Sequence, residues 1–150
     1  ESSLTDVLSP TTKEDLRWPE RLKTPRIVRD LHEVGVDPAA SLASLSFPIN
    51  SVPQARGALY VAEGSTLGGM MMKKMWEKDP LIGPHVSFQF LGCYGQQTGA
   101  YWKSFIAVLE STVTESDDEV ETIAAAQATF EFYQTCHRRV VAAMQFSPPF

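Results

Sequence analysis

The sequence has 150 residues, of which 43% are hydrophobic and 21% charged, as is usual for a protein that folds around a core. The net charge of −5 argues against a nucleic-acid surface, and no apolar run approaches the roughly 20 residues that cross a bilayer. Cys93 and Cys136 form neither a metal-spaced pair nor a disulfide framework, which favours a reducing compartment. We therefore expect a single domain over residues 1–150 of a cytoplasmic protein, with no nucleic-acid or membrane partner.

Helix signals begin in the first third of the sequence. Thr24 as N-cap and Pro25 at the first helical position predict a helix, which Gly35 ends by supplying a left-handed cap. A second start signal at Asp37 predicts a short helix that ends before the step from Phe47 to Pro48.

The middle of the sequence predicts one long helix and a connector. Ser51 and Gln54 form a capping box that opens a helix over residues 52–78. Residues 85–90 alternate like a short strand, but a lone alternating run has no partner in the sequence. We therefore interpret residues 81–95 as an extended connector or a helical turn.

Two further helices are predicted over residues 97–112 and 117–144, and a capping box of Ser116 with Glu119 opens the second. The buried side of this last helix is predicted to comprise Val120, Ile123, Ala124, Phe130, Tyr133 and Val140. Helices that follow one another with short connections, without βαβ alternation, predict an all-α fold arranged as a multi-helical bundle.

The long helix contains an unusual number of glycines. Gly64, Gly68 and Gly69 fall within six residues, and each costs about 1 kcal/mol relative to alanine inside a helix. A phosphate loop is excluded, because no strand precedes the segment and its spacing matches no phosphate-binding motif. Two uses stay open from spacing alone: close contact with another helix, and close approach of a flat, rigid ligand.

This segment, LYVAEGSTLGG over residues 59–69, resembles the distal-helix motif of bacterial haem oxygenases, especially the biliverdin-producing group associated with bacteriophytochromes. The resemblance extends over residues 16–145, with supporting matches at Trp18, Arg21, Lys23, Asp30, Leu31, Gly35, Tyr94, Gly95, Trp102, Phe105, Ala128, Thr129 and Phe130. It implies a haem oxygenase-like helical bundle that acts as a monooxygenase, an oxidoreductase that cleaves haem to biliverdin, iron and carbon monoxide. Haem is then both substrate and cofactor. An external reductase or ferredoxin supplies the electrons, and a bacteriophytochrome is an expected partner.

The resemblance also implies roles for individual residues. Gly64 and Gly68 match the positions nearest the iron, Gly69 adjoins them, and Ser65 falls where a water network is anchored. The resemblance thus implies a catalytic set of Gly64, Ser65 and Gly68, and a haem-binding set of Gly64, Gly68, Gly69, Lys103 and Phe130. In these sets Lys103 pairs with a haem propionate and Phe130 packs on the porphyrin. Met70 departs from the family, which often has glutamine there.

The proximal histidine of the family has no counterpart in this sequence. None of the three histidines, His32, His85 and His137, matches its position, so no metal ligand is assigned. We expect that the native protein has a further segment before Glu1 that carries this ligand. The alternative is a non-catalytic module of the same fold that binds a tetrapyrrole or a partner protein. An all-α hydrolase of the thiamin type is less favoured, because neither cysteine has the context of a nucleophile.

Overall fold

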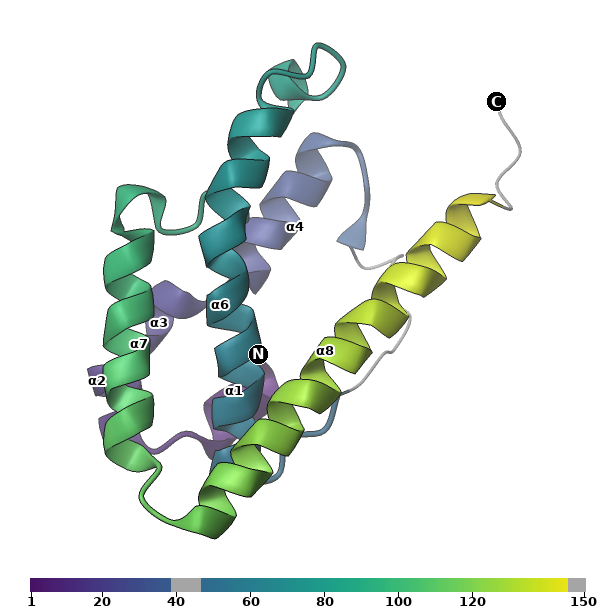
Figure 1. The fold of residues 1–150 in the computed structure, drawn as a ribbon. Coiled ribbons are helices and arrows are strands. Elements are labelled where there is room, and N and C mark those ends of the chain that lie inside the picture. Colours follow the sequence, from purple (N-terminus) through teal and green to yellow (C-terminus); the bar gives the residue numbers. More distant parts are fainter. Residues whose placement is uncertain (39–46, 146–150) are drawn as a thin grey trace.

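The computed structural model describes residues 1–38 and 47–145, and every regular element within these ranges is helical (Figure 1), which confirms the predicted all-α class. None of the described helices is both long enough and apolar enough to span a bilayer. The elements in chain order are α1 (Ser2–Val7), α2 (Pro10–Asp15), α3 (Trp18–Arg21), α4 (Thr24–Glu33), α6 (Val52–Trp76), the 3-10 turns η1 (Gly83–His85) and η2 (Gly95–Gln97), α7 (Thr98–Thr112) and α8 (Ser116–Gln145).

Helix α6 runs through the middle of the fold, with α7 on one side and α8 on the other (Figure 1). A short link joins α7 and α8 at one end of α6, and the two helices diverge from there. The short N-terminal helices contribute apolar side chains to a core under α6. Its buried members are Leu4, Leu8, Leu16, Trp18, Ala55, Ala58, Leu59 and Phe105.

Most of the predicted element boundaries are close to the observed ones. Gly35 has a φ of +74° and ends α4 as expected, while Ser51 accepts the Gln54 amide at 3.2 Å and caps α6. Two predicted caps were wrong by one residue, because α4 and α8 already include Thr24 and Ser116 as their first helical residues. The connector before α7 contains 3-10 turns and no strand, as expected. The predicted helix after Asp37 falls on residues 39–46, outside the described residues.

The predicted buried side of α8 is wrong. Its large apolar residues are largely exposed, with exposed fractions of 64% for Val120 and 53% for Phe130, and the buried residues are Thr122, Ala125 and Thr129. The reason is a close crossing with α6 at Gly57. A Cβ on Gly57 would lie 2.7 Å from the Ala125 Cβ and closer still to the Thr122 carbonyl oxygen. Only small side chains fit between backbones that approach so closely.

A second constraint on α6 is the carboxylate of Glu63, which is fully buried. Lys23 places its Nζ 2.5 Å from Oε1, and Arg21 forms an ion pair with Oε2 through Nη1. The Tyr94 hydroxyl donates a hydrogen bond to Oε1 at 2.9 Å. Arg21 and Lys23 are themselves only 2% and 8% exposed. These four side chains, Glu63, Arg21, Lys23 and Tyr94, are called the buried ion cluster below.

The buried ion cluster holds two cations and one carboxylate, and aromatic rings help to stabilise the excess positive charge. The Nζ of Lys23 lies 5.4 Å from the Tyr94 ring, and the guanidinium carbon of Arg21 lies 5.2 Å from the Tyr101 ring. The two rings stack on each other at 4.1 Å. Burial, followed by the charge of Glu63 and the hydrogen bond to it, raises the pKa of Tyr94, which therefore stays protonated and donates to the carboxylate.

The close crossing predicts opposite effects for the same substitution at two glycines of α6. Gly57→Ala should lower the free energy of unfolding by about 1–3 kcal/mol, because its methyl group overlaps α8. Gly68→Ala should raise it by up to about 1 kcal/mol, since its methyl group meets no described atom and alanine favours the helix. Urea unfolding followed by circular dichroism measures both, and equal effects at the two positions would contradict the crossing.

The buried ion cluster predicts a large cost for removing one charge. Glu63→Gln should lower the free energy of unfolding by about 3–5 kcal/mol, because it leaves two buried cations without a counter-ion. The matched control is Asp118→Asn, which breaks the partly exposed Arg56–Asp118 ion pair between α6 and α8 and should cost about 1 kcal/mol or less. Urea unfolding compares the two variants, and a loss at Glu63 no larger than at Asp118 would refute the role of the cluster.

Candidate functional site

The glycine segment gives α6 two different faces. Residues 60, 64, 67, 68 and 71 share one side of the helix by their spacing, and we call this side the glycine face. It is apolar and largely open to solvent, with Leu67 48% and Met71 70% exposed. Glu63, Thr66 and Gly69 lie on the other side, and all three are buried. An exposed apolar helix face of this kind is typical of a ligand or partner site.

The three glycines of the motif have different surroundings. A Cβ on Gly68 would meet no described atom within 4 Å, and one on Gly64 would touch the Trp102 ring at an ordinary 3.6 Å. A Cβ on Gly69, in contrast, would lie 2.7 Å from the carbonyl oxygen of Leu91. Packing within the protein therefore explains Gly69 but does not explain Gly64 or Gly68. Of the two uses left open by their spacing, helix contact does not account for the glycine face.

Phe130 belongs to a cavity beside the glycine face. This cavity, called the second cavity below, has a volume of about 570 Å³ and lies between α6, α7 and α8. Tyr60 joins it to the glycine face, because Tyr60 lines the cavity and its ring lies 5.5 Å from the ring of Trp102, which covers Gly64. The residues that line it are Tyr60, Leu109, Glu110, Val113, Glu119, Thr122, Ile123, Ala126, Gln127 and Phe130. Two of the apolar residues of α8 that were expected in the core, Ile123 and Phe130, are found here.

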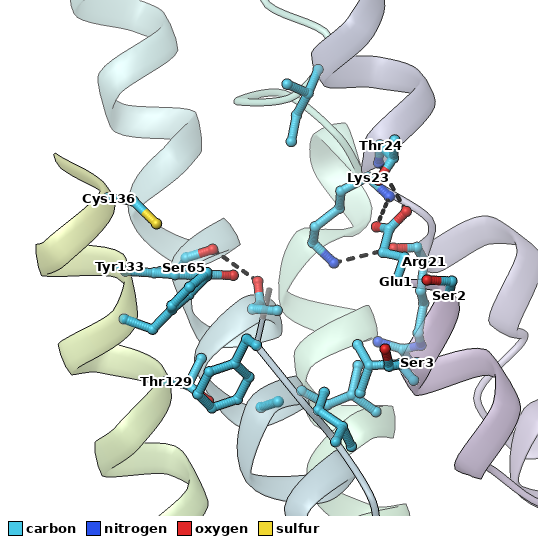
Figure 2. Close-up of a pocket in the computed structure, with 18 of the residues that line it drawn as sticks. Glu1, Ser2, Ser3, Arg21, Lys23, Thr24, Ser65, Thr129, Tyr133 and Cys136 are labelled. Carbon is cyan, nitrogen blue, oxygen red and sulfur yellow. Dashed lines mark hydrogen bonds between the residues drawn. The ribbon is translucent and has the colours of Figure 1, made fainter. Parts of the chain in front are cut away.

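Ser65 lines a different cavity, on another side of α6. This first cavity has a volume of about 690 Å³, and Figure 2 shows Ser65 beside Tyr133 and Cys136 of α8, with Arg21 and Lys23 on the α3 and α4 side. The Ser65 hydroxyl donates to the Ala62 carbonyl at 2.8 Å, which leaves the hydroxyl oxygen able to accept a hydrogen bond.

Partial removal from water, with smaller effects of Glu1 and Cys136, raises the pKa of Tyr133 in this first cavity. Tyr133 therefore keeps its proton and can act as a hydrogen-bond donor there. The first cavity thus holds neutral hydroxyl groups on its α6 and α8 side, and on the other side the carboxylate of Glu1 and the two cations that are paired with Glu63. Most of the other lining residues are apolar, so these polar groups mark the part of the cavity that is suited to holding ordered water.

One of the expected site residues, Lys103, does not line either cavity beside α6. Lys103 is exposed on α7 and lines neither cavity, although it directly follows Trp102. The three histidines are also exposed and line neither of these cavities. Within the described residues, no group of three or more His, Cys, Asp or Glu side chains is arranged to hold a metal ion.

The sequence patterns did not single out two residues that shape this region. Glu63 was part of the quoted motif, but its partners Arg21 and Lys23 lie about 40 residues away in the sequence, so spacing could not reveal the buried ion cluster. Gly57 was visible only as one more glycine, and its role depends on where α8 crosses. The local signal for Glu63 was that it is the only charged residue in the glycine-rich stretch over residues 57–72.

Comparisons with known proteins agree with this geometry. The family model described as "Heme oxygenase" matches residues 48–139, which include all of α6 and α7 and most of α8. A relative from Xanthomonas campestris pv. campestris (strain 8004), named "Heme oxygenase", is 32% identical over 119 residues, covering 79% of this chain and 69% of the relative. No solved structure matches the chain. The glycine motif, the helical fold and both matches together place this chain in the heme oxygenase family.

Proposed function

We propose that this chain binds haem against the glycine face of α6 and cleaves it oxidatively to biliverdin, iron and carbon monoxide. The observation that carries the proposal is Gly68, which lies open in the middle of an exposed apolar face while the opposite side of α6 is fixed. A flat ligand can approach the backbone here because no Cβ keeps it away. Haem has this shape, and its degradation is the activity of the family to which the chain belongs.

The other expected residues fit around a haem at this face. Gly68 leaves the space over the ring, Gly64 adds a position without a side chain beside Trp102, and Gly69 lets the connector at Leu91 pack close behind the helix. Phe130 offers an aromatic edge from the second cavity, which Tyr60 joins to the same face. Lys103, exposed beside Trp102, offers an ammonium to a propionate at the rim, where a mobile point charge is suitable.

Ser65 supports the supply of protons from the first cavity. Haem, when bound, supplies the iron at which dioxygen is reduced, and this chemistry consumes protons. The Ser65 hydroxyl can accept a hydrogen bond from water without bringing a charge to the site. Because Ser65 lies three residues before Gly68 and so beside it on the helix surface, water held on Ser65 borders the glycine face near Gly68. The neutral hydroxyl of Tyr133 on α8 lines the same cavity and extends the polar surface.

The reaction needs partners outside this chain. We propose that an external reductase or ferredoxin in the cytoplasm supplies the electrons, and that a bacteriophytochrome receives the biliverdin. These partners follow from the family motif at residues 59–69. We also propose that residues 1–150 form a single domain.

A haem titration of this chain tests the proposal. The described histidines line neither cavity, so external imidazole is included as a substitute for an axial ligand. We expect a Soret band to develop as haem is added, and imidazole to tighten binding and sharpen the band. Absorption spectroscopy measures both effects. If no spectral change appears with or without imidazole, haem is not the ligand and a partner-binding module is favoured.

A substitution at Gly68 separates ligand binding from folding. Gly68→Leu should weaken haem binding by about tenfold or more, the loss that corresponds to about 1.4 kcal/mol, because its side chain occupies the ligand's space. The stability of the ligand-free protein should not fall, since a Cβ at this position would meet no described atom of another element within 4 Å. The matched control is Gly99→Leu on α7, which also meets open space and should leave haem affinity unchanged. Equal affinities of the two variants would place haem elsewhere.

A further inference from the structure

The rotation of α6 about its own axis decides where the glycine face points, but the glycine face does not set that rotation. Gly68 meets nothing, and Gly64 could accept a Cβ at ordinary distance from Trp102, so neither position interlocks with a neighbour. Thr66 is buried, yet its hydroxyl donates to the Glu63 carbonyl of the same helix at 2.6 Å. Gly69 packs closely against the Leu91 backbone, but among residues 60–69 the described hydrogen bonds and ion pairs to other elements are those of Glu63.

The Glu63 carboxylate is held from several directions at once. Lys23 and Tyr94 reach Oε1, while Arg21 reaches Oε2. Arg21 is in turn fixed by the carbonyl oxygens of Leu16 at 2.5 Å and Tyr101 at 3.2 Å. The carboxylate is thus tied to the chain before α4, to the connector before α7 and, through Arg21, to α7 itself.

Such a group is suited to fixing a register. Apolar side chains can slide over one another at little cost, whereas a buried charge that loses its partners is strongly penalised. Because successive residues of an α-helix are about 100° apart, fixing the direction of Glu63 also fixes the directions of Gly64 and, four residues later, Gly68.

We propose that Glu63 is a positioning residue, whose buried contacts with Arg21, Lys23 and Tyr94 set the rotation of α6 and so aim Gly64 and Gly68 at the haem. The identity of the ligand rests on the proposed function, but the rotation is a property of the chain without ligand. Glu63 does not touch the ligand and acts through the two glycines.

The position of Trp102 allows the rotation to be measured directly. Its ring lies against Gly64, whereas Trp76 is exposed at the far end of α6 and serves as an internal reference. The full chain is labelled with 5-fluorotryptophan and studied by fluorine NMR without haem, well below the unfolding temperature, and Trp102→Phe assigns the resonance. We expect Glu63→Gln to shift or split the Trp102 resonance and to leave that of Trp76 in place.

Haem affinity, measured with imidazole on the same samples, gives a second and independent readout. Glu63→Gln should weaken haem binding several-fold, because the glycine face is no longer aimed at the ligand. Glu63→Asp keeps the charge on a side chain that is one methylene group shorter. It should recover part of the haem affinity and bring the Trp102 chemical shift part of the way back to that of the unaltered chain. Asp118→Asn is the control. It removes the ion pair between Asp118 of α8 and Arg56 of α6, in which Nη1 and Oδ2 are 3.0 Å apart, and it should change neither readout.

Two milder variants keep the test decisive if Glu63→Gln does not fold. Lys23→Met and Tyr94→Phe each remove one partner of the carboxylate and leave the Arg21 pair in place. Both variants should shift the Trp102 resonance in the same direction, while Asp118→Asn should leave it in place.

The outcomes separate this inference from the proposed function. An unmoved Trp102 resonance in folded Glu63 variants, or an equal shift in Asp118→Asn, overturns the positioning role. A shifted resonance with unchanged haem affinity overturns the link to the ligand. If the unaltered chain binds no haem at all, the proposed function fails, and the Trp102 resonance still decides whether Glu63 sets the rotation.

Discussion

A carboxylate that is wholly removed from water must find cations inside the protein, and in this fold Glu63 finds both of its cations on one short stretch of chain, at Arg21 and Lys23. This requirement holds the link between α3 and α4 against the middle of α6. It also explains how α3, a helix of four residues that is too short to be stable alone, keeps a defined place in the fold. Apolar residues of the N-terminal segment then complete the core.

With one side of α6 committed in this way, the segment over residues 63–69 presents three environments within two turns. Glu63 lies in the buried ion cluster, Gly64 and Gly68 lie on the open face, and Ser65 lines a cavity with hydroxyl groups. A helix that is packed on one side, open on another and bordered by polar groups on a third can place a ligand next to both a rigid support and hydroxyl groups that can hold water. This division suits a reaction in which a bulky substrate must be held close to a supply of water.

The long elements were predictable because their signals are local. Capping residues, proline and the spacing of apolar residues identified α6, α7 and α8 to within a few residues, and Gly35 took the predicted left-handed conformation. The side of α8 that is buried was not predictable, since periodicity assigns the largest apolar residues to the core. In the structure, Gly57 lets α8 come so near that Thr122 and Ala125 are buried instead, and Phe130 faces a cavity.

For the candidate site, the motif located the important segment but did not show that its residues have different roles. Sequence spacing treats Gly64, Gly68 and Gly69 alike, although only Gly69 is required by a neighbouring backbone, at Leu91. The role of Glu63 depended on partners about 40 residues earlier in the chain, which no local pattern can supply. The short N-terminal helices were missed for a related reason, because tertiary contacts rather than local signals stabilise them.

The two kinds of glycine in α6 would have different fates over evolution. Gly57 and Gly69 are demanded by neighbouring backbone, so any descendant that keeps the fold must keep them or repack around them. Gly64 and Gly68 are not demanded by the fold, and a helix gains stability when such positions change to alanine. A lineage that lost the ligand would therefore be free to replace these two and would gain stability by doing so. Their retention beside Gly57 and Gly69 would report selection for a ligand, whereas Gly57 and Gly69 report only selection for a fold.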